Sequence, residues 1–266
     1  MAEAIQLLIS TVLLRPYVFV FLAFYLAAAS VAIGWRRTVL LTGIAWVVAF
    51  SAEYSSTRNG IPFGFYSYIP DTKGRELWIS NVPFMDSLSF TFLAYISFTL
   101  AQWLRLPIGA SEREVVAVRR SWPVLALTAF LFMLIDVVID PVALRGDRWF
   151  LGKIYNYPEP GLYFGVPLTN FLGWAVVGFV TIWVFQQVDR TLSLDKRSSR
   201  GVRPILLGVM LYYLVLVFNL VMTFAIGEML LGMTGVLLYI PITWMVFKRY
   251  WQWSAAHRFV GRGALS

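Results

Sequence analysis

Five acidic residues stand beside or inside long apolar runs of this 266-residue chain, and their side chains are the best placed to do chemistry. An ionisable group within a membrane span is costly, so its default interpretation is functional. Carboxyl groups that meet in one place supply both proton donors and proton acceptors. For Asp86 and Glu228, each of which opens a span, an ordinary interfacial charge is the simpler alternative. The five acids are Glu53, Asp86, Asp136, Asp140 and Glu228.

Asp136 and Asp140 form the sharpest pattern, because four positions separate them in Ile-Asp-Val-Val-Ile-Asp-Pro. That spacing puts both carboxyl groups on one helix face, about 6 Å apart along the axis. Two carboxylates in a low dielectric cannot both ionise cheaply, so one should keep its proton and act as a general acid. Pro141 is expected to end the helix, because a proline disfavours the α region for the preceding residue. Structurally, Asp140 could instead cap the helix or pair with Arg145, and Asp136 could bond a neighbouring helix.

Glu53 opens a polar, aromatic loop, residues 53–68, which reads Glu-Tyr-Ser-Ser-Thr-Arg-Asn-Gly-Ile-Pro-Phe-Gly-Phe-Tyr-Ser-Tyr. Such a segment is out of place in a mostly apolar chain, which favours a functional role. We expect Glu53 to take part in catalysis and Tyr66 and Tyr68 to line a pocket. Arg58 offers the alternative of a purely structural partner for Glu53.

A second aromatic loop, within residues 149–174, resembles the first, since both carry Phe-Gly near a proline and tyrosines. Interfacial aromatic residues are common as membrane anchors, which is the alternative to lining a cavity. Asn170 would lie where a span begins, able to hold a water or hydroxyl group or to bond across helices structurally. Trp149, Tyr163 and Trp174 are the candidate lining residues of this loop.

Composition excludes several kinds of site. The chain has no cysteine and one histidine, His257, which excludes disulfides, thiolate nucleophiles, Cys-ligated metals and histidine-rich di-iron sites. Neither a Gly-x-Gly-x-x-Gly segment after a strand nor a Walker Gly-Lys-Ser/Thr loop occurs, so nothing supports nucleotide or flavin binding. We therefore predict neither a metal nor a cofactor. Any catalysis would use carboxyl, hydroxyl, amide, basic and aromatic side chains.

The elements that must position these residues are membrane helices. The chain is 59% hydrophobic and 14% charged, with a mean hydropathy of +0.71, which is typical of an integral membrane protein. We predict an all-α, polytopic membrane helix bundle, a single domain over residues 1–266, with an interfacial helix at 4–14 and no cleaved signal peptide. The seven predicted spans lie near 17–35, 38–53, 84–104, 121–140, 167–187, 204–226 and 229–247.

Basic residues predict the orientation. Seven of the 22 lysines and arginines fall on the side of the N-terminus, and fifteen fall on the other side. The positive-inside rule makes the second side cytoplasmic, so the topology is N-out and C-in, in the cell membrane. The polar segment 188–203 is then a flexible cytoplasmic connector, and the five acids lie near the outer boundary. The net charge of +8 is explained by topology, so no nucleic-acid partner is predicted.

These residues resemble the membrane carotenoid-biosynthesis proteins, a family that includes carotenoid 1′,2′-hydratases acting on γ-carotene-type and bisanhydrobacterioruberin-type end groups. The motifs cover residues 53–174 in order, and the last two spans add little beyond hydropathy. They are Glu53 with Gly60-Ile-Pro-Phe-Gly-Phe-Tyr-Ser-Tyr68, Val82-Pro83, Asp136-x-x-x-Asp140-Pro141 and Tyr163-Phe-Gly-Val-Pro-x-x-Asn170-x-x-Gly173-Trp174.

The resemblance implies a cofactor-independent hydro-lyase that adds water to the terminal double bond of an acyclic carotenoid in the bilayer, giving a tertiary alcohol. Other carotenoid-pathway enzymes are candidate partners. On chemical grounds we assign the proton donor to Asp136 or Asp140, and the capture of water to Glu53 or the remaining aspartate, with Asn170 positioning the water. The expected lining of the end-group pocket is Tyr66, Tyr68, Trp149, Tyr163, Trp174, Asp86 and Arg58.

Two other functions remain open at this stage. A carotenoid end-group cyclase or isomerase would use the same protonation, but the Pro-x-Glu-Glu signature associated with small membrane lycopene cyclases is absent. A non-catalytic seven-helix protein that binds or transports lipid or carotenoid is the other. A retinal protein would need a lysine near mid-membrane, whereas Lys248 lies at the edge of the last span. A transporter would place polar groups near the midplane.

Overall fold

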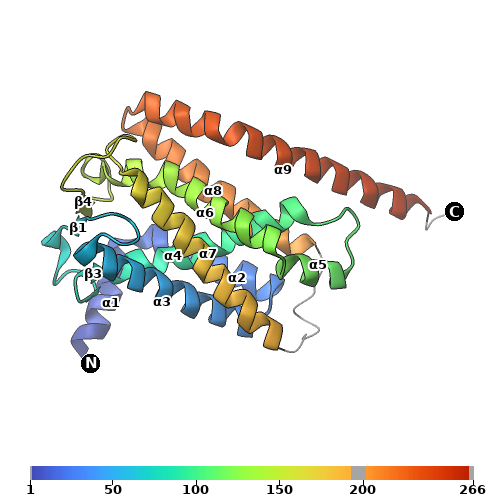
Figure 1. Ribbon diagram of the computed structural model, residues 1–266, viewed down its shortest axis with the longest axis horizontal. Helices are drawn as coiled ribbons and strands as arrows, with labels where there is room; N and C mark the ends of the chain where they lie inside the picture. The colour runs from blue at the N-terminus through green and yellow to red at the C-terminus, as the bar shows by residue number, and fades with distance from the viewer. Residues whose placement is uncertain (1, 193–201, 264–266) are drawn as a thin grey trace.

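The computed structural model describes residues 2–192 and 202–263, whose long helices run side by side in one bundle (Figure 1). The helices are α1 (Ala2–Leu14), α2 (Pro16–Ala32), α3 (Trp35–Asn59), α4 (Phe84–Arg105), α5 (Glu112–Arg119), α6 (Trp122–Ala143), α7 (Leu168–Thr191), α8 (Arg203–Ala225) and α9 (Met229–Gly263). The strands are β1 (Ser67–Tyr68), β2 (Trp78–Ile79), β3 (Val82–Pro83) and β4 (Tyr155–Asn156), with 3-10 turns at Pro70–Thr72 and Gly146–Arg148.

Within the described ranges, six helices are long and apolar enough to cross a membrane: α3, α4, α6, α7, α8 and α9. Helices α1 and α2 bend by 93° at their junction and add a seventh span if the pair is taken as one. The predicted all-helical, polytopic bundle is confirmed. The first N-terminal residues and the end of α9 lie at opposite ends of the bundle (Figure 1), while the N-out, C-in orientation stays a prediction.

Helix α4 is the centre of the bundle. Of the residues in the most apolar stretch of α4, 83% are buried, whereas the corresponding fraction for α9 is 28%. It packs against α2, α3, α6 and α8. A helix that is apolar on all sides must be buried in protein or face lipid. Helix α9 has apolar side chains on the outside of the bundle, such as Leu230 and Trp244, which can face lipid.

The two aromatic loops meet at one end of the bundle, where the strand labels gather in Figure 1. Strand β1 pairs with β4 in antiparallel register, with Ser67 opposite Asn156 and Tyr68 opposite Tyr155. Strands β2 and β3 form a second small ladder. The similarity seen between the loops in the sequence thus corresponds to direct backbone pairing across about ninety residues of chain.

Helix α1, the predicted interfacial helix, is tied to the same end. The guanidinium of Arg15 donates two hydrogen bonds of 3.2 Å to the carboxylate of Glu76 and a third to the carbonyl of Leu151. The backbone N–H of Leu77 donates to the hydroxyl of Thr11 at 2.7 Å. Because Arg15 and Glu76 are both buried, losing either would leave the other charge uncompensated.

A charged cluster lies at the opposite end of the bundle. The carboxylate of Asp189 on α7 forms ion pairs with Arg37 at 2.5 Å, Arg119 at 3.2 Å and Arg120 at 2.7 Å. Gln186, one turn earlier, donates to the carbonyl of Arg119 at 2.9 Å. These contacts join α3, α5, the α5–α6 connection and α7 around one buried carboxylate.

Several predicted boundaries were wrong. Pro141 does not end its helix, because the N–H of Leu144 bonds the carbonyl of Asp140 at 2.8 Å and α6 continues to Ala143. Helix α3 begins before and ends after the predicted span at 38–53, and α9 runs well past 247. Helix α5 was missed, although Ser111 and Glu114 form a capping box at its start. Most of the predicted connector 188–203 lies outside the described residues.

Candidate active site

A cavity opens between α3, α4, α6 and α7 at the strand-bearing end of the bundle. Its free space, which includes the open mouth, is about 520 Å³. Four of the five acids predicted from the sequence line it, and each lies within about two turns of a helix end. The predicted residues in its wall are Glu53, Tyr66, Asp86, Asp136, Asp140, Asn170 and Trp174.

Asp136 and Asp140 share one partner, Asn170. The side-chain amide nitrogen of Asn170 lies 2.8 Å from Asp136 Oδ2 and 3.1 Å from Asp140 Oδ2. Asp140 also accepts from the hydroxyls of Tyr155 and, at 2.9 Å, Tyr157. Asp140 therefore has three donors and Asp136 has one. The second oxygen of Asp136, Oδ1, is buried and has no hydrogen-bond partner, which leaves it as the unsatisfied polar atom of the cavity wall.

Glu53 and Asp86 form a second carboxyl pair, bridged by a tyrosine. The hydroxyl of Tyr68 lies 2.8 Å from Glu53 Oε1 and 2.6 Å from Asp86 Oδ2, and Ser87 donates to the other oxygen of Glu53. Burial, together with the adjacent carboxyl groups, raises the pKa of Tyr68 well above its usual value, so the phenol keeps its proton. One phenolic proton cannot serve two carboxylates, so a carboxyl proton must complete one of these two bonds.

Aromatic rings form another part of the cavity wall. The rings of Phe90 and Trp174 stack with centroids 4.3 Å apart, and Phe63 lies beside both. Gly173 makes this approach possible, since a Cβ atom there would lie 2.8 Å from the backbone of Phe63. Tyr66 faces Tyr155 in an edge contact at 5.9 Å. The cavity wall thus carries both carboxyl groups and aromatic rings.

The fifth acid does not join the cavity. Glu228 forms ion pairs with Arg145 at 3.0 Å and with Arg148, and its side chain is 23% exposed. Desolvation opposes ionisation, but hydrogen bonds from these two arginines hold the pKa of Glu228 below its usual value. Glu228 therefore matches the alternative considered for it, an ordinary interfacial charge. Arg145, considered as a partner for Asp140, takes this glutamate instead.

Four predicted lining residues do not line this cavity: Arg58, Tyr163, Trp149 and Tyr68. Arg58 does not pair with Glu53: it bonds Asn81 Oδ1 at 2.7 Å and stacks 3.4 Å over the ring of Tyr54. Tyr163 packs its ring on neighbouring aromatic residues of its own loop and helix. Trp149 lines an adjoining pocket rather than this one. Tyr68 contacts Glu53 and Asp86 through its hydroxyl instead of lining the cavity.

Sequence analysis missed the hydroxyl donors Ser87, Tyr155 and Tyr157. Ser87 directly follows Asp86, and this adjacency could have suggested a shared site. Tyr155 and Tyr157 flank a single residue, so an extended backbone puts both rings on one side. That signal was present in the sequence, but a strand of two residues is too short to be recognised from periodicity.

Ion pairs in the described part of the chain lie away from the cavity, at Glu76, Asp189 and Glu228. The cavity acids instead contact neutral hydroxyl and amide groups. Among the described residues, no group of three His, Cys, Asp or Glu side chains is arranged to hold a metal ion. The site can donate a proton, accept a proton and stabilise a cation against aromatic rings.

Comparison with known proteins gives a family and one curated relative. The profile of the family described as "Carotenoid biosynthesis protein" matches residues 8–242. The bisanhydrobacterioruberin hydratase of Haloarcula japonica is 28% identical over 150 residues, which are 56% of this chain and 45% of that protein. The match thus spans less than half the length of this relative. No solved structure matches the chain significantly.

Proposed function

This chain belongs to the carotenoid biosynthesis protein family, and on that basis we propose that it hydrates the terminal C=C bond of an acyclic carotenoid end group. The relative that is named a hydratase supports water as the second reactant. The proposed substrate lies in the bilayer of the cell membrane, where the product could pass to other carotenoid-pathway enzymes. The reaction is a 1′,2′-hydration that gives a tertiary alcohol.

The observation that carries this proposal is that Oδ1 of Asp136 is buried and has no hydrogen-bond partner. A carboxylate tends to attract donors to both oxygens, as Asp140 does. Asp136 accepts one bond at Oδ2 and has none at the buried Oδ1. This pattern fits a carboxylic acid whose O–H faces the cavity, where an alkene carbon can receive the proton. Alkenes accept no ordinary hydrogen bond, so an unpartnered donor suits such a substrate.

In the first step Asp136 transfers its proton to the CH carbon of the isopropylidene group. The π electrons form the new C–H bond, and the neighbouring carbon, which bears two methyl groups, becomes a tertiary cation. Trp174 and Phe90 present aromatic surface in the same cavity, and such surface stabilises a cation. The apolar wall also excludes bulk water, so the cation meets only water that the site admits.

In the second step a water oxygen bonds to the tertiary carbon. The water proton passes to the ionised member of the Glu53–Asp86 pair, which Tyr68 and Ser87 orient. One proton has been given and one taken, so turnover needs no redox partner. The cycle closes when the Glu53–Asp86 pair releases the proton it took up and Asp136 takes up another, by exchange with water that enters the cavity. Ser89 of the cavity wall and the Tyr157 hydroxyl supply groups that can hold the water beforehand.

The test is expression in a host that accumulates lycopene, followed by mass analysis of the pigments in H₂¹⁸O. Hydration predicts a product heavier than lycopene by one water, carrying ¹⁸O. A product with the mass of lycopene but a shifted spectrum would instead indicate cyclisation or isomerisation. Unchanged pigment that co-purifies with the protein would indicate a carrier. Either of the last two results refutes the hydratase.

A further inference from the structure

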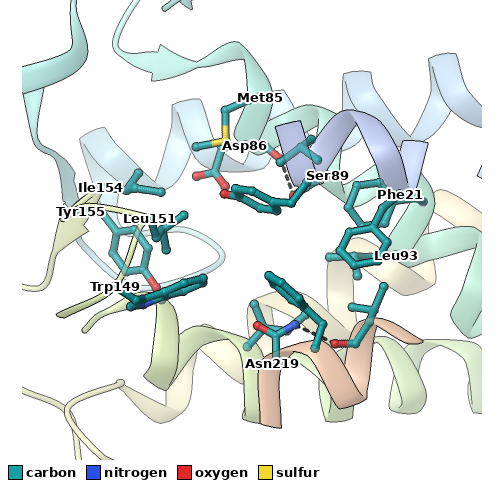
Figure 2. Close-up of a pocket in the computed structure, with 17 residues that line it drawn as sticks. Phe21, Met85, Asp86, Ser89, Leu93, Trp149, Leu151, Ile154, Tyr155 and Asn219 are labelled. Atoms are coloured by element: carbon teal, nitrogen blue, oxygen red, sulfur yellow. Dashed lines mark hydrogen bonds between the residues drawn. The ribbon is translucent and has the colours of Figure 1, made fainter. Parts of the chain in front are cut away.

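A second pocket adjoins the acid cavity, between α2, α4, α6 and α8. Its free space is about 640 Å³ including the open mouth. Figure 2 shows Asp86 and Ser89 on one side of this space and Asn219 on the opposite side, with Tyr155 beside Trp149. The two pockets share six lining residues, so they adjoin along a common wall. The shared residues are Asp86, Ser89, Leu93, Ile139, Ala143 and Tyr155.

The second pocket differs from the acid cavity in chemistry. Beyond the shared wall its lining is largely aliphatic and aromatic, with Phe21 packed at 5.7 Å on both Phe92 and Phe218. Val18 and Val215 also line this pocket. Flat aromatic faces and branched aliphatic groups give close contact to a planar hydrocarbon chain and offer few groups for anything polar.

The far side of this pocket reaches the protein surface through a group of aromatic rings. Phe150, which is 60% exposed, contacts Tyr17 at 5.6 Å and Phe218 at 6.3 Å. Trp149 lies against Phe150 at 5.0 Å. The apolar lining is therefore continuous from the shared wall at Asp86 to a ring that faces the surroundings.

We propose that this second pocket holds the conjugated chain of the same molecule whose end group occupies the acid cavity. The carotenoid then enters between α2 and α8, passes the shared wall at Asp86 and Ser89, and stops with its terminal double bond beside Asp136. This assignment rests on the proposed carotenoid substrate, not on the hydration step. It makes Val215 and Phe218 residues that recognise the chain.

The first test narrows the pocket. Val215 is 2% exposed and lines it, whereas its neighbour Leu214 is 49% exposed on the other side of α8. Val215→Trp should reduce the lycopene retained per purified protein by about tenfold, because the indole occupies the space of several chain carbons. Leu214→Trp adds a similar bulk outside and should retain wild-type amounts. Equal retention by both variants would overturn the assignment.

The second test works even when the bulky variant fails to fold. The chain has no cysteine, so Val215→Cys introduces a single thiol with little change in volume. The thiol should react with a small, lipid-soluble methanethiosulfonate in empty protein, and saturating lycopene should slow that reaction at least about fivefold. Leu214→Cys should react equally with and without lycopene. A thiol at position 215 that is inert, or that reacts at one rate in both states, refutes the chain pocket.

Both tests measure the binding of lycopene, and neither requires the protein to convert it. If the protein binds lycopene but adds no water, the hydratase proposal fails while the chain pocket can still pass. If water is added but Val215 shows neither effect, the hydratase stands and the chain takes another path.

Discussion

Asp136→Asn should abolish most of the activity while leaving the fold intact. The amide has nearly the same shape as the carboxyl group, and its oxygen can still accept the 2.8 Å bond from Asn170. Its NH₂ group then takes the place of Oδ1, which has no partner to lose. What disappears is the acidic proton. Positioned general acids contribute about 10²–10⁴-fold, which corresponds to about 2.7–5.4 kcal/mol of barrier.

Asp140→Asn is the matched comparison, because it makes the same chemical change four residues away. Asp140 accepts from Tyr155, Tyr157 and Asn170. An amide has one acceptor oxygen in place of two, so at least one buried donor loses its partner, at a cost of about 1–3 kcal/mol. We therefore expect Asp140→Asn to lower the thermal unfolding midpoint and Asp136→Asn to leave it nearly unchanged.

The assay compares both variants with the wild type in a lycopene-producing host at equal protein levels. The ratio of hydroxylated pigment to lycopene is measured by chromatography and mass analysis, and unfolding is followed on purified protein. Wild-type levels of hydroxylated pigment from Asp136→Asn would falsify its role as the acid. A large drop in its unfolding midpoint would show that the bare Oδ1 has a structural role instead.

Three further predictions concern the supports of the site. Tyr68→Phe removes the hydroxyl between two carboxyl groups, and the turnover rate should fall by about tenfold or more with a stability loss of about 1–3 kcal/mol, measured by pigment kinetics and thermal unfolding. Gly173→Ala places a methyl group 2.8 Å from the backbone of Phe63 and should cost about 1–3 kcal/mol. Gly43→Ala, on α3 with open space around it, should be neutral or slightly stabilising in the same melt, and equal melting of the two alanine variants would contradict the packing argument. Asp189→Asn leaves three buried or half-buried arginines without their carboxylate and should cost about 3–5 kcal/mol, whereas the turnover of the folded fraction should stay near wild type.

The sequence predicts much of the architecture because membrane helices are defined by long apolar runs. It also predicts the approach of Asp136 to Asp140, since an i, i+4 spacing puts both on one face regardless of tertiary context. Asp86 and Glu53 join them because alternating spans bring their ends to one side of the bundle. The structure supports that convergence, while the catalytic roles of these residues stay predictions.

Glu228 shows the limit of such reasoning, because the sequence left open both a functional role and an ordinary interfacial charge for it. A carboxylate at the start of a span looks the same whether it faces a cavity or a loop. Its position depends on Arg145 and Arg148, which come from the connection after α6 and have no periodic pattern. The donors Tyr155 and Tyr157 were missed for the same reason. Their placement follows from the pairing of β4 with β1, a tertiary contact that cannot be predicted from the sequence of such short strands.

The ion pairs of Asp189 have a mechanical consequence for the other end of the molecule. They hold α3, α5 and α7 together at one end, whereas the carboxyl groups at the other end are held by hydroxyl and amide groups. Along α7 the distance from Asp189 to Asn170 is about 28 Å at 1.5 Å per residue. A tilt of about 4° around the Asp189 end would move Asn170 by about 2 Å over that length. Because any rotation at the Asp189 end is multiplied along α7 in this way, the ion pairs there help to keep Asn170 within hydrogen-bond distance of Asp136 and Asp140.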